Sequence, residues 1–272
     1  MIFETHAHYD DQRYTEDREA LLASLPAKGI GRIINVGASV ETTKAALQLA
    51  GAHTYIYAAV GVHPSEVGGL NEESFAWLSA QTENPKVAAV GEIGLDYYWE
   101  KEEEVRECQR YWFRRQLELA AGAGLPVIIH SRDAAEDTMR ILREAGVWET
   151  GVERNTVEGG AVCGVIHCYS YSPEMAEEFV RMGYAIGVGG VVTFKNAKKL
   201  KETVQRIPLQ RLLLETDCPY MAPEPHRGER NDSSYLPYVA EKVAELKGIS
   251  REEVERVTWE NAAALFPKSG KA

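Results

Sequence analysis

Short apolar runs rich in β-branched residues alternate along the chain with longer segments in which apolar residues recur every three or four positions. The first pattern predicts strands that are buried on both faces, and the second predicts amphipathic helices. Strands are predicted at 2–6, 32–36, 55–60, 87–93, 126–130, 162–167, 185–188 and 211–216. Helices are predicted at 15–28, 41–50, 72–80, 102–121, 134–144, 173–182, 197–206, 233–247 and 251–265.

The alternation of strands and helices with short connections indicates an all-parallel sheet that is covered by helices. Eight such units in 272 residues predict a closed (β/α)8 barrel, or TIM barrel, formed by a single domain over residues 1–272. An open doubly wound sheet is the alternative, but no G-x-G-x-x-G follows the first strand, which weakens its dinucleotide-binding version. The polar, glycine-bearing segment 147–160 is predicted to be an excursion loop within the barrel.

The composition narrows the classes of function. No run of 18 apolar residues occurs, so no membrane span is expected, and the N-terminus lacks the pattern of a signal peptide. The four cysteines show no C-x-x-C spacing, which is typical of a protein from the reducing cytoplasm. A net charge of −11 argues against broad non-specific binding to nucleic acid, although it does not exclude a phosphate substrate that metal ions hold locally.

Side chains that can bind metals stand at the carboxyl ends of five predicted strands. They are His6, His8, Glu92, His130, His167 and Asp217. Because the active site of a (β/α)8 barrel lies at the carboxyl ends of its strands, these side chains are expected to converge. A lone His-x-His motif would be weak evidence, but isolated polar groups are costly to bury without partners. The whole set therefore predicts a metal site.

The ligand types and their number predict two divalent cations. Imidazole and carboxylate ligands without thiolate suit Mg, Mn or Zn, as well as Fe and Ni. Four histidines and two carboxylates exceed the three protein ligands usual for one catalytic zinc, so we expect two ions that share a carboxylate. Such a pair can bind a phosphoryl oxygen, generate hydroxide and stabilise a leaving oxygen. Glu92 and Asp217 are the predicted catalytic carboxylates, with Asp217 as acceptor of the water proton.

Three further residues are candidates for binding the substrate. His63 follows the third predicted strand, and Arg132 follows the fifth, where it could contact a phosphate or instead cap the next helix. Arg227 follows the eighth strand by several residues. Its planar guanidinium could bind a phosphate through two N–H groups, and the alternative is that Arg227 is only a surface residue in a loop.

The motifs that contain these residues resemble those of the TatD family of metal-dependent hydrolases, within the amidohydrolase-like barrels. The matching stretches are Thr5-His6-Ala7-His8, Gly61-Val62-His63-Pro64, Gly91-Glu92-Ile93-Gly94-Leu95-Asp96-Tyr97, Ile129-His130-Ser131-Arg132, His167-Cys168-Tyr169-Ser170, Gly190–Ala197, Glu215-Thr216-Asp217-Cys218-Pro219-Tyr220, Arg227-Gly228 and Asn261–Phe266. The resemblance implies a two-metal hydrolase of phosphodiester bonds, typically a deoxyribonuclease that acts as an exonuclease on single-stranded DNA, with RNA as a further possibility. It also implies that His6, His8 and Asp217 hold one metal, that His130 and His167 hold the other, and that Glu92 bridges them.

The sequence departs from the family pattern at two positions near the expected site. Tyr171 stands where the family usually has glycine, and Glu229 replaces the lysine of an Arg-Gly-Lys motif. Both bear on substrate preference, so a metal-dependent hydrolase of another ester or amide, such as aminoacyl-tRNA, is the alternative. A non-catalytic metal-binding scaffold is a third hypothesis, which predicts a missing ligand, and none is missing. Neither a membrane nor an obligate protein partner is indicated.

Overall fold

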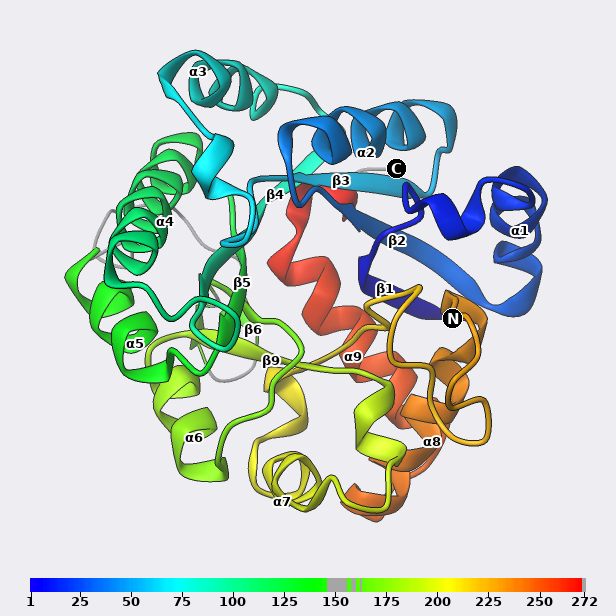
Figure 1. Cartoon of the computed structure of the whole chain (residues 1–272). Coiled ribbons are helices and arrows are strands. Elements are labelled where there is room, and N and C mark those ends of the chain that lie inside the picture. The colour runs from blue at the N-terminus through cyan, green and yellow to red at the C-terminus, as the bar shows by residue number, and fades with distance from the viewer. Residues whose placement is uncertain (146–155, 158–159, 162, 271–272) are drawn as a thin grey trace.

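The computed structural model describes residues 1–145, 156–157, 160–161 and 163–270. Its main sheet has eight strands in the order β1-β2-β3-β4-β5-β8-β9-β10, and every pairing is parallel. The strands are β1 (Ile2–Ala7), β2 (Ile30–Val36), β3 (Ile56–Val60), β4 (Val87–Asp96), β5 (Val127–Arg132), β8 (Gly164–Ile166), β9 (Tyr184–Val188) and β10 (Leu212–Leu214). Figure 1 looks along the barrel that they form.

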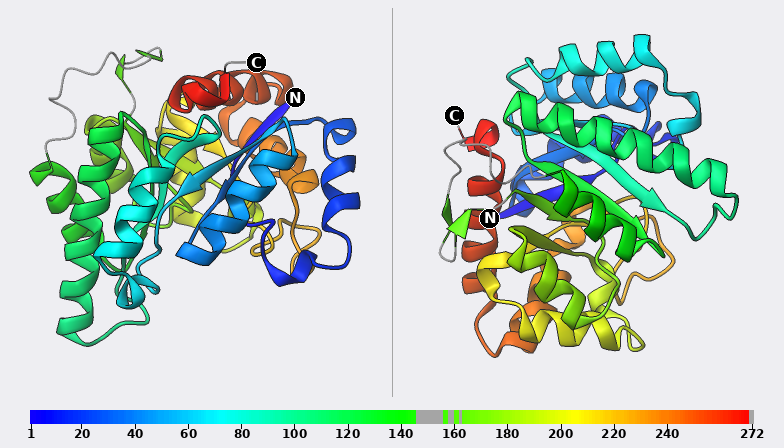
Figure 2. Two further views of the ribbon diagram at one scale, coloured as in Figure 1. Left: turned by 90° about the horizontal axis from the view of Figure 1, so that it is seen from above. Right: turned by 90° about the vertical axis from the view of Figure 1, so that its left-hand side faces the viewer.

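Helices surround the barrel and close one of its ends (Figures 1 and 2). They are α1 (Arg18–Ser24), α2 (Val40–Ala52), α3 (Glu72–Gln81), α4 (Glu103–Ala123), α5 (Ala135–Glu144), α6 (Pro173–Arg181), α7 (Lys198–Arg206), α8 (Leu236–Lys247) and α9 (Arg251–Leu265). The predicted TIM barrel is therefore confirmed. Within the described ranges, no helix combines the length and the apolar character needed to cross a bilayer.

Side chains alternate between two buried layers along the strands. In β3, Ile56 and Val60 pack in the layer between barrel and helices, whereas Tyr57 and Ala59 belong to a second cluster inside the barrel. This is the period of two that a strand imposes, and it explains why the strands are apolar on both faces. Phe266, directly after α9, joins the inner cluster, so α9 closes the amino-terminal end of the barrel (Figure 2).

Backbone hydrogen bonds next to the predicted metal ligands close the barrel. The N–H of Asp217 donates to the carbonyl of His6, and the N–H of His8 donates to the carbonyl of Cys218, both at 2.9 Å. Ala7 forms a parallel bridge with Cys218 between these two bonds. The first strand and the segment after β10 therefore meet where both carry site residues.

Several predicted elements have different bounds in the structure, and two of these differences have a clear local cause. The predicted helix 15–28 is interrupted, because Pro26 ends the α-helical hydrogen bonding and begins a separate 3-10 turn, Pro26–Lys28. The predicted strand 87–93 continues to Asp96, because its last residues pair with β5, as in the pair Gly94–His130. Glu92 therefore lies within β4 rather than at its end.

The predicted excursion loop 147–160 falls mostly outside the described residues. Of this segment, 147–155 and 158–159 are not described. Thr156–Val157 (β6) and Gly160–Ala161 (β7) pair as a two-stranded antiparallel sheet. Near the C-terminus, the predicted helix 233–247 begins with a 3-10 turn, Ser233–Tyr235, before α8.

Candidate metal centre

Two histidines and two carboxylates meet at the carboxyl end of β1. The Nε2 atoms of His6 and His8 lie 3.0 Å apart. Glu92 Oε2 lies 3.4 Å from His6 Nε2 and 3.8 Å from His8 Nε2. Asp217 Oδ1 lies 3.8 Å and 3.4 Å from the same two nitrogens. These four atoms form one compact set of donors, all of a type that binds divalent cations.

The second carboxylate oxygen of Glu92 faces a different group of histidines. Glu92 Oε1 lies 2.9 Å from His130 Nδ1, and 3.8 Å from the Nε2 atoms of His63 and His167. Glu92 itself is 4% exposed, so its carboxylate depends on these neighbours rather than on water. One carboxylate thus joins two sets of donors, one through each oxygen.

A hydrogen bond to the backbone orients the imidazole of His8. Its Nδ1 donates to the carbonyl of Val36 at 2.9 Å, which leaves Nε2 as the nitrogen that faces the other donors of the site. Two imidazole nitrogens 3.0 Å apart, with carboxylate oxygens within 4 Å, fit a divalent cation in chemistry and in number. These residues therefore fit the metal that the sequence predicts.

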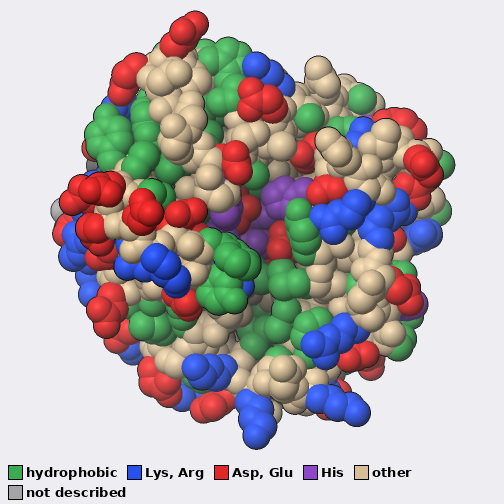
Figure 3. Space-filling model, viewed as in Figure 1, with side chains coloured by type: hydrophobic (Ala, Val, Ile, Leu, Met, Phe, Trp, Pro, Cys, Tyr) green, Lys and Arg blue, Asp and Glu red, His purple; other side chains and the backbone are tan. Residues whose placement is uncertain are grey.

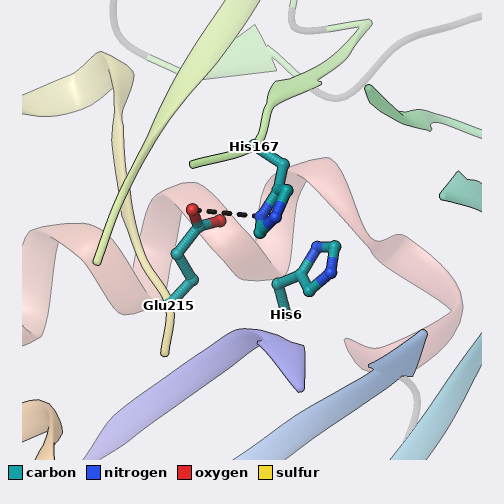
Figure 4. A group of neighbouring side chains, drawn as sticks. All are labelled: His6, His167 and Glu215. Carbon is teal, nitrogen blue, oxygen red and sulfur yellow. Dashed lines mark ion pairs between the residues drawn. The ribbon is translucent and has the colours of Figure 1, made fainter. Parts of the chain in front are cut away.

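Glu215, which the sequence analysis did not single out, orients His167. Its Oε1 lies 3.1 Å from His167 Nδ1 and accepts a 2.6 Å hydrogen bond from the N–H of Cys168. Figure 4 shows this carboxylate pointing at His167, whose ring stacks on that of His6 at 3.4 Å between centroids. A Cβ on Gly187 would lie 2.4 Å from Glu215 Oε2, so only glycine leaves room for this carboxylate. Carboxylates in this position are common behind metal-binding histidines.

Asp96 plays the same part for His130 and was also missed. Its Oδ2 lies 3.2 Å from His130 Nε2, and its Oδ1 accepts a 2.9 Å hydrogen bond from the N–H of Tyr98. Nε2 of His130 therefore faces Asp96, and Nδ1 faces Glu92. The sequence does place both residues at strand ends. Asp96 ends β4 and Glu215 directly follows β10, and each belongs to one of the motifs that resemble the TatD family.

A further buried carboxylate, Glu4, fastens β1 to the segment after β10. Glu4 Oε1 accepts hydrogen bonds from the N–H groups of His6 and Thr216, at 3.1 and 2.9 Å. Glu4 Oε2 accepts from the hydroxyls of Thr216 and Ser233, at 2.7 and 2.9 Å. Fully buried, Glu4 holds together the two segments that carry His6 and Asp217.

The electrostatics of the site keep Glu92 ionised and His63 neutral. Burial opposes the charge on Glu92, but the surrounding imidazoles, His63 and His6 foremost, hold its pKa well below the usual range. Burial lowers the pKa of His63 to about 4. The N–H of Ser65 donates to His63 Nδ1 at 3.1 Å, so neutral His63 carries its proton on Nε2, the atom that faces Glu92.

A cavity of about 980 Å³ opens over these side chains and includes His63 and Arg132 in its lining. Figure 3 shows histidine side chains at the floor of a hollow in this face, with hydrophobic and charged side chains around it. Arg227 is not among the lining residues. It lies over the Phe194 ring, 4.3 Å from its centroid, and 3.9 Å from Glu224. The structure thus brings two of the three substrate-binding candidates to the cavity.

Both departures from the family pattern have local partners. The hydroxyl of Tyr171 accepts a 3.2 Å hydrogen bond from the N–H of Ala134 and lies 2.9 Å from Ser131 Oγ. It therefore braces the backbone on both sides of Arg132, the last residue of β5. Glu229 accepts a hydrogen bond from the Tyr235 hydroxyl, so its carboxylate is engaged in the loop before α8.

Comparison with known proteins gives one consistent result. Residues 3–267 match the family model described as TatD related DNase. An uncharacterized metal-dependent hydrolase of Bacillus subtilis, YabD, is 43% identical over 266 residues, which cover 98% of this chain and 99% of that protein. YcfH of Escherichia coli, with the same description, is 35% identical over 98% of this chain and 96% of its own length.

A solved structure agrees with the sequence relatives. The crystal structure of YjjV, a TatD homolog from Escherichia coli, superimposes with a TM-score of 0.87 at 33% identity, over 98% of both chains. The family match over nearly the whole chain, the relatives and the buried groups of histidines and carboxylates agree with one another. The chain therefore belongs to the TatD family of metal-dependent hydrolases.

Proposed function

We propose that the protein is a deoxyribonuclease that hydrolyses phosphodiester bonds at an end of single-stranded DNA with the help of two divalent cations. The observation that carries this proposal is the position of Glu92, whose two oxygens face separate groups of histidines, at 3.4 Å from His6 and 2.9 Å from His130. A carboxylate shared in this way is what a pair of cations requires. The match to the TatD related DNase family supports DNA as the substrate.

The residues divide into two ligand sets in this proposal. His6, His8 and Asp217 would hold one cation, His130 and His167 would hold the other, and Glu92 would bridge them. When bound, such a pair supplies Lewis-acid stabilisation of the phosphoryl group and lowers the pKa of an attacking water. Mg, Mn and Zn all suit these ligands, so the native metal has to be measured.

In this proposal, side chains that line the cavity accept the proton of the attacking water and bind the phosphates. The side chain of Asp217 is 17% exposed against 5% for Glu92, so Asp217 is the carboxylate placed to accept the proton of the attacking water. The Nε2–H of neutral His63 donates a hydrogen bond to a phosphoryl oxygen as negative charge develops there. Arg132, at the rim, binds a flanking phosphate.

Metal analysis coupled to an oligonucleotide assay tests this function. The purified protein is expected to bind two equivalents of metal and to release nucleotides one at a time from one end of a labelled single-stranded oligonucleotide. Oligonucleotides labelled at either the 5′ or the 3′ end give the polarity. Glu92→Ala should remove the activity and lower the metal content, while Glu118→Ala, an exposed glutamate on α4, should change neither.

The ester or amide alternative is an outcome of the same experiment. Within this alternative, the net charge of −11 favours a small ester or amide, because a long polyanion such as DNA or tRNA gains nothing from the overall field of this protein. Wild-type protein that holds two equivalents of metal, leaves DNA and RNA intact and hydrolyses aminoacyl-tRNA would overturn the deoxyribonuclease proposal. Full activity of Glu92→Ala on DNA would overturn the two-cation arrangement.

A further inference from the structure

Two large aromatic side chains are exposed at the rim of the metal cavity, in the loop between β4 and α4. Trp99 is 69% exposed and Tyr98 is 42% exposed. Their rings meet edge to face, 4.7 Å apart between centroids. Trp99 lines the cavity that contains the metal ligands. Because Trp99 is so little buried, packing within this chain does not account for its position at the mouth.

Arg132, from the end of β5, completes this group. Its guanidinium carbon lies 3.9 Å from the centroid of the Tyr98 ring and 5.7 Å from that of Trp99. Among the described residues, no carboxylate lies within ion-pair distance of Arg132. Arg13 offers a contrast on another part of the rim: it stacks on Tyr220 at 4.2 Å, but its guanidinium is paired with Asp11. Tyr98, Trp99 and Arg132 are called the rim platform below.

The backbone under the rim platform is held in place from both sides. Asp96 Oδ1 accepts hydrogen bonds from the N–H groups of Tyr98 and Trp99, at 2.9 and 3.4 Å, and its other oxygen faces His130. Tyr171 braces the backbone on both sides of Arg132, through Ser131 and Ala134. The aromatic rings are therefore presented by an ordered loop that shares a carboxylate with the candidate metal site.

We propose that the rim platform is a binding site for the nucleobase next to the scissile phosphate. The base stacks on Trp99, and the guanidinium of Arg132 binds the adjoining phosphate. This inference rests on the proposed function and adds to it the contact that selects single-stranded ends. A base within a duplex is paired and stacked on both faces, whereas an unpaired base can turn a face to Trp99.

The charge of the protein supports a contact of this kind. Because the net charge of the protein is −11, its overall electrostatic field does not attract the negatively charged DNA backbone. Affinity must then come from local contacts, and stacking on an aromatic ring is one that does not depend on net charge. Alanine substitution of such a ring weakens binding by roughly five- to a hundredfold per base.

Steady-state kinetics of Trp99→Ala test the proposal. On a single-stranded oligonucleotide, its KM should rise roughly tenfold with kcat within about twofold of wild type, and Trp99→Phe should restore most of the affinity. Tyr111→Ala is the matched control, because Tyr111 is a 48% exposed aromatic residue on α4 outside the cavity, and its KM should equal that of wild type.

A substrate with abasic nucleotides at both ends separates stacking from a structural effect. Wild type should bind it as weakly as Trp99→Ala binds the ordinary oligonucleotide, and Trp99→Ala should suffer no further loss. Two results would overturn the rim platform while leaving the deoxyribonuclease proposal intact. In one, Trp99→Ala raises KM by the same factor, relative to wild type, on the ordinary and on the abasic oligonucleotide. In the other, Trp99→Ala leaves KM on the ordinary oligonucleotide unchanged. Wild-type protein that releases nucleotides from neither substrate would overturn both.

Discussion

The backbone N–H of Asp217 donates a 2.9 Å hydrogen bond to the carbonyl of His6. Together with the hydrogen bond from the N–H of His8 to the carbonyl of Cys218, it ties the end of the barrel to its beginning at the point where each segment carries a candidate metal ligand. The Oδ1 of Asp217 then lies 3.8 Å from the Nε2 of His6. The segments that close the barrel are therefore also the segments that carry these ligands, and residues that support the closure should affect both.

Glu4→Ala should destabilise the protein more than most single substitutions. It removes the acceptor of four hydrogen bonds and leaves the buried N–H groups of His6 and Thr216 without a partner. We expect the free energy of unfolding to fall by about 3–5 kcal/mol. Urea denaturation of Glu4→Ala and wild type measures this difference.

Ser233→Ala is the control for Glu4→Ala. It removes one hydroxyl donor to Glu4 and leaves the two backbone donors paired, so the loss should be about 1 kcal/mol. Equal losses in the two variants would show that Glu4 does not fasten β1 to the last strand.

The fold could be predicted because the strands are short, apolar and regularly separated along the sequence. The predicted strand ends were also accurate enough to predict that five residues lie close together: His6, Glu92, His130, His167 and Asp217. The sequence did not reveal Asp96 and Glu215. Sequence alone does not tell which of several carboxylates near a strand end turns toward an imidazole, because that depends on the local backbone. The roles of the ligands themselves stay predictions.

The two arginines were harder to place for a related reason. Arg132 and Arg227 were both candidates for contacting a phosphate, and of the two Arg132 lines the cavity. The side chain of Arg227 packs over Phe194, a contact between two loops that no sequence period encodes. The rim position of Trp99 likewise depends on the path of the β4–α4 loop, which Asp96 fixes.

Glu215→Gln should weaken metal binding without unfolding the barrel. The amide has no charge to fix the proton on His167 Nδ1, and it keeps only one oxygen for the Cys168 N–H. Loss of a carboxylate behind a ligating histidine costs roughly 10- to 100-fold in metal affinity or activity. Competition with a chelating dye of known affinity measures the metal dissociation constant.

Gly187→Ala offers an independent check on Glu215. The added methyl group would meet Glu215 Oε2 at 2.4 Å, so the carboxylate must move away from His167. We expect a loss of metal affinity similar to that of Glu215→Gln. Wild-type affinity in both variants would mean that Glu215 does not position His167.

Tyr171→Phe should affect substrate binding more than catalysis. It removes the hydroxyl that pairs with the Ala134 N–H and Ser131 Oγ, and so loosens the backbone on both sides of Arg132. The loss of one such hydrogen bond corresponds to a rise in KM of roughly fivefold, with kcat nearly unchanged. Steady-state kinetics on the oligonucleotide substrate give both constants.

Tyr55→Phe is the matched control for Tyr171→Phe. Its hydroxyl donates to the carbonyl of Leu22, away from the residues that line the cavity, so both kinetic constants should equal those of wild type. If Tyr171→Phe also leaves KM unchanged, the departure from glycine at this position has no bearing on the substrate.

Arg132→Ala and Arg227→Ala should separate the two arginines that the sequence analysis placed together. Arg132 lines the cavity and has no ion-pair partner among the described residues, so its loss should raise KM for the oligonucleotide roughly tenfold. It should also lower the slope of log KM against log salt by about 0.7, the value for one phosphate contact on a single strand. Arg227 already contacts Phe194 and Glu224, so Arg227→Ala should leave both quantities within error of wild type. A larger effect for Arg227→Ala than for Arg132→Ala would place the DNA path on the β10 side of the cavity, away from Trp99.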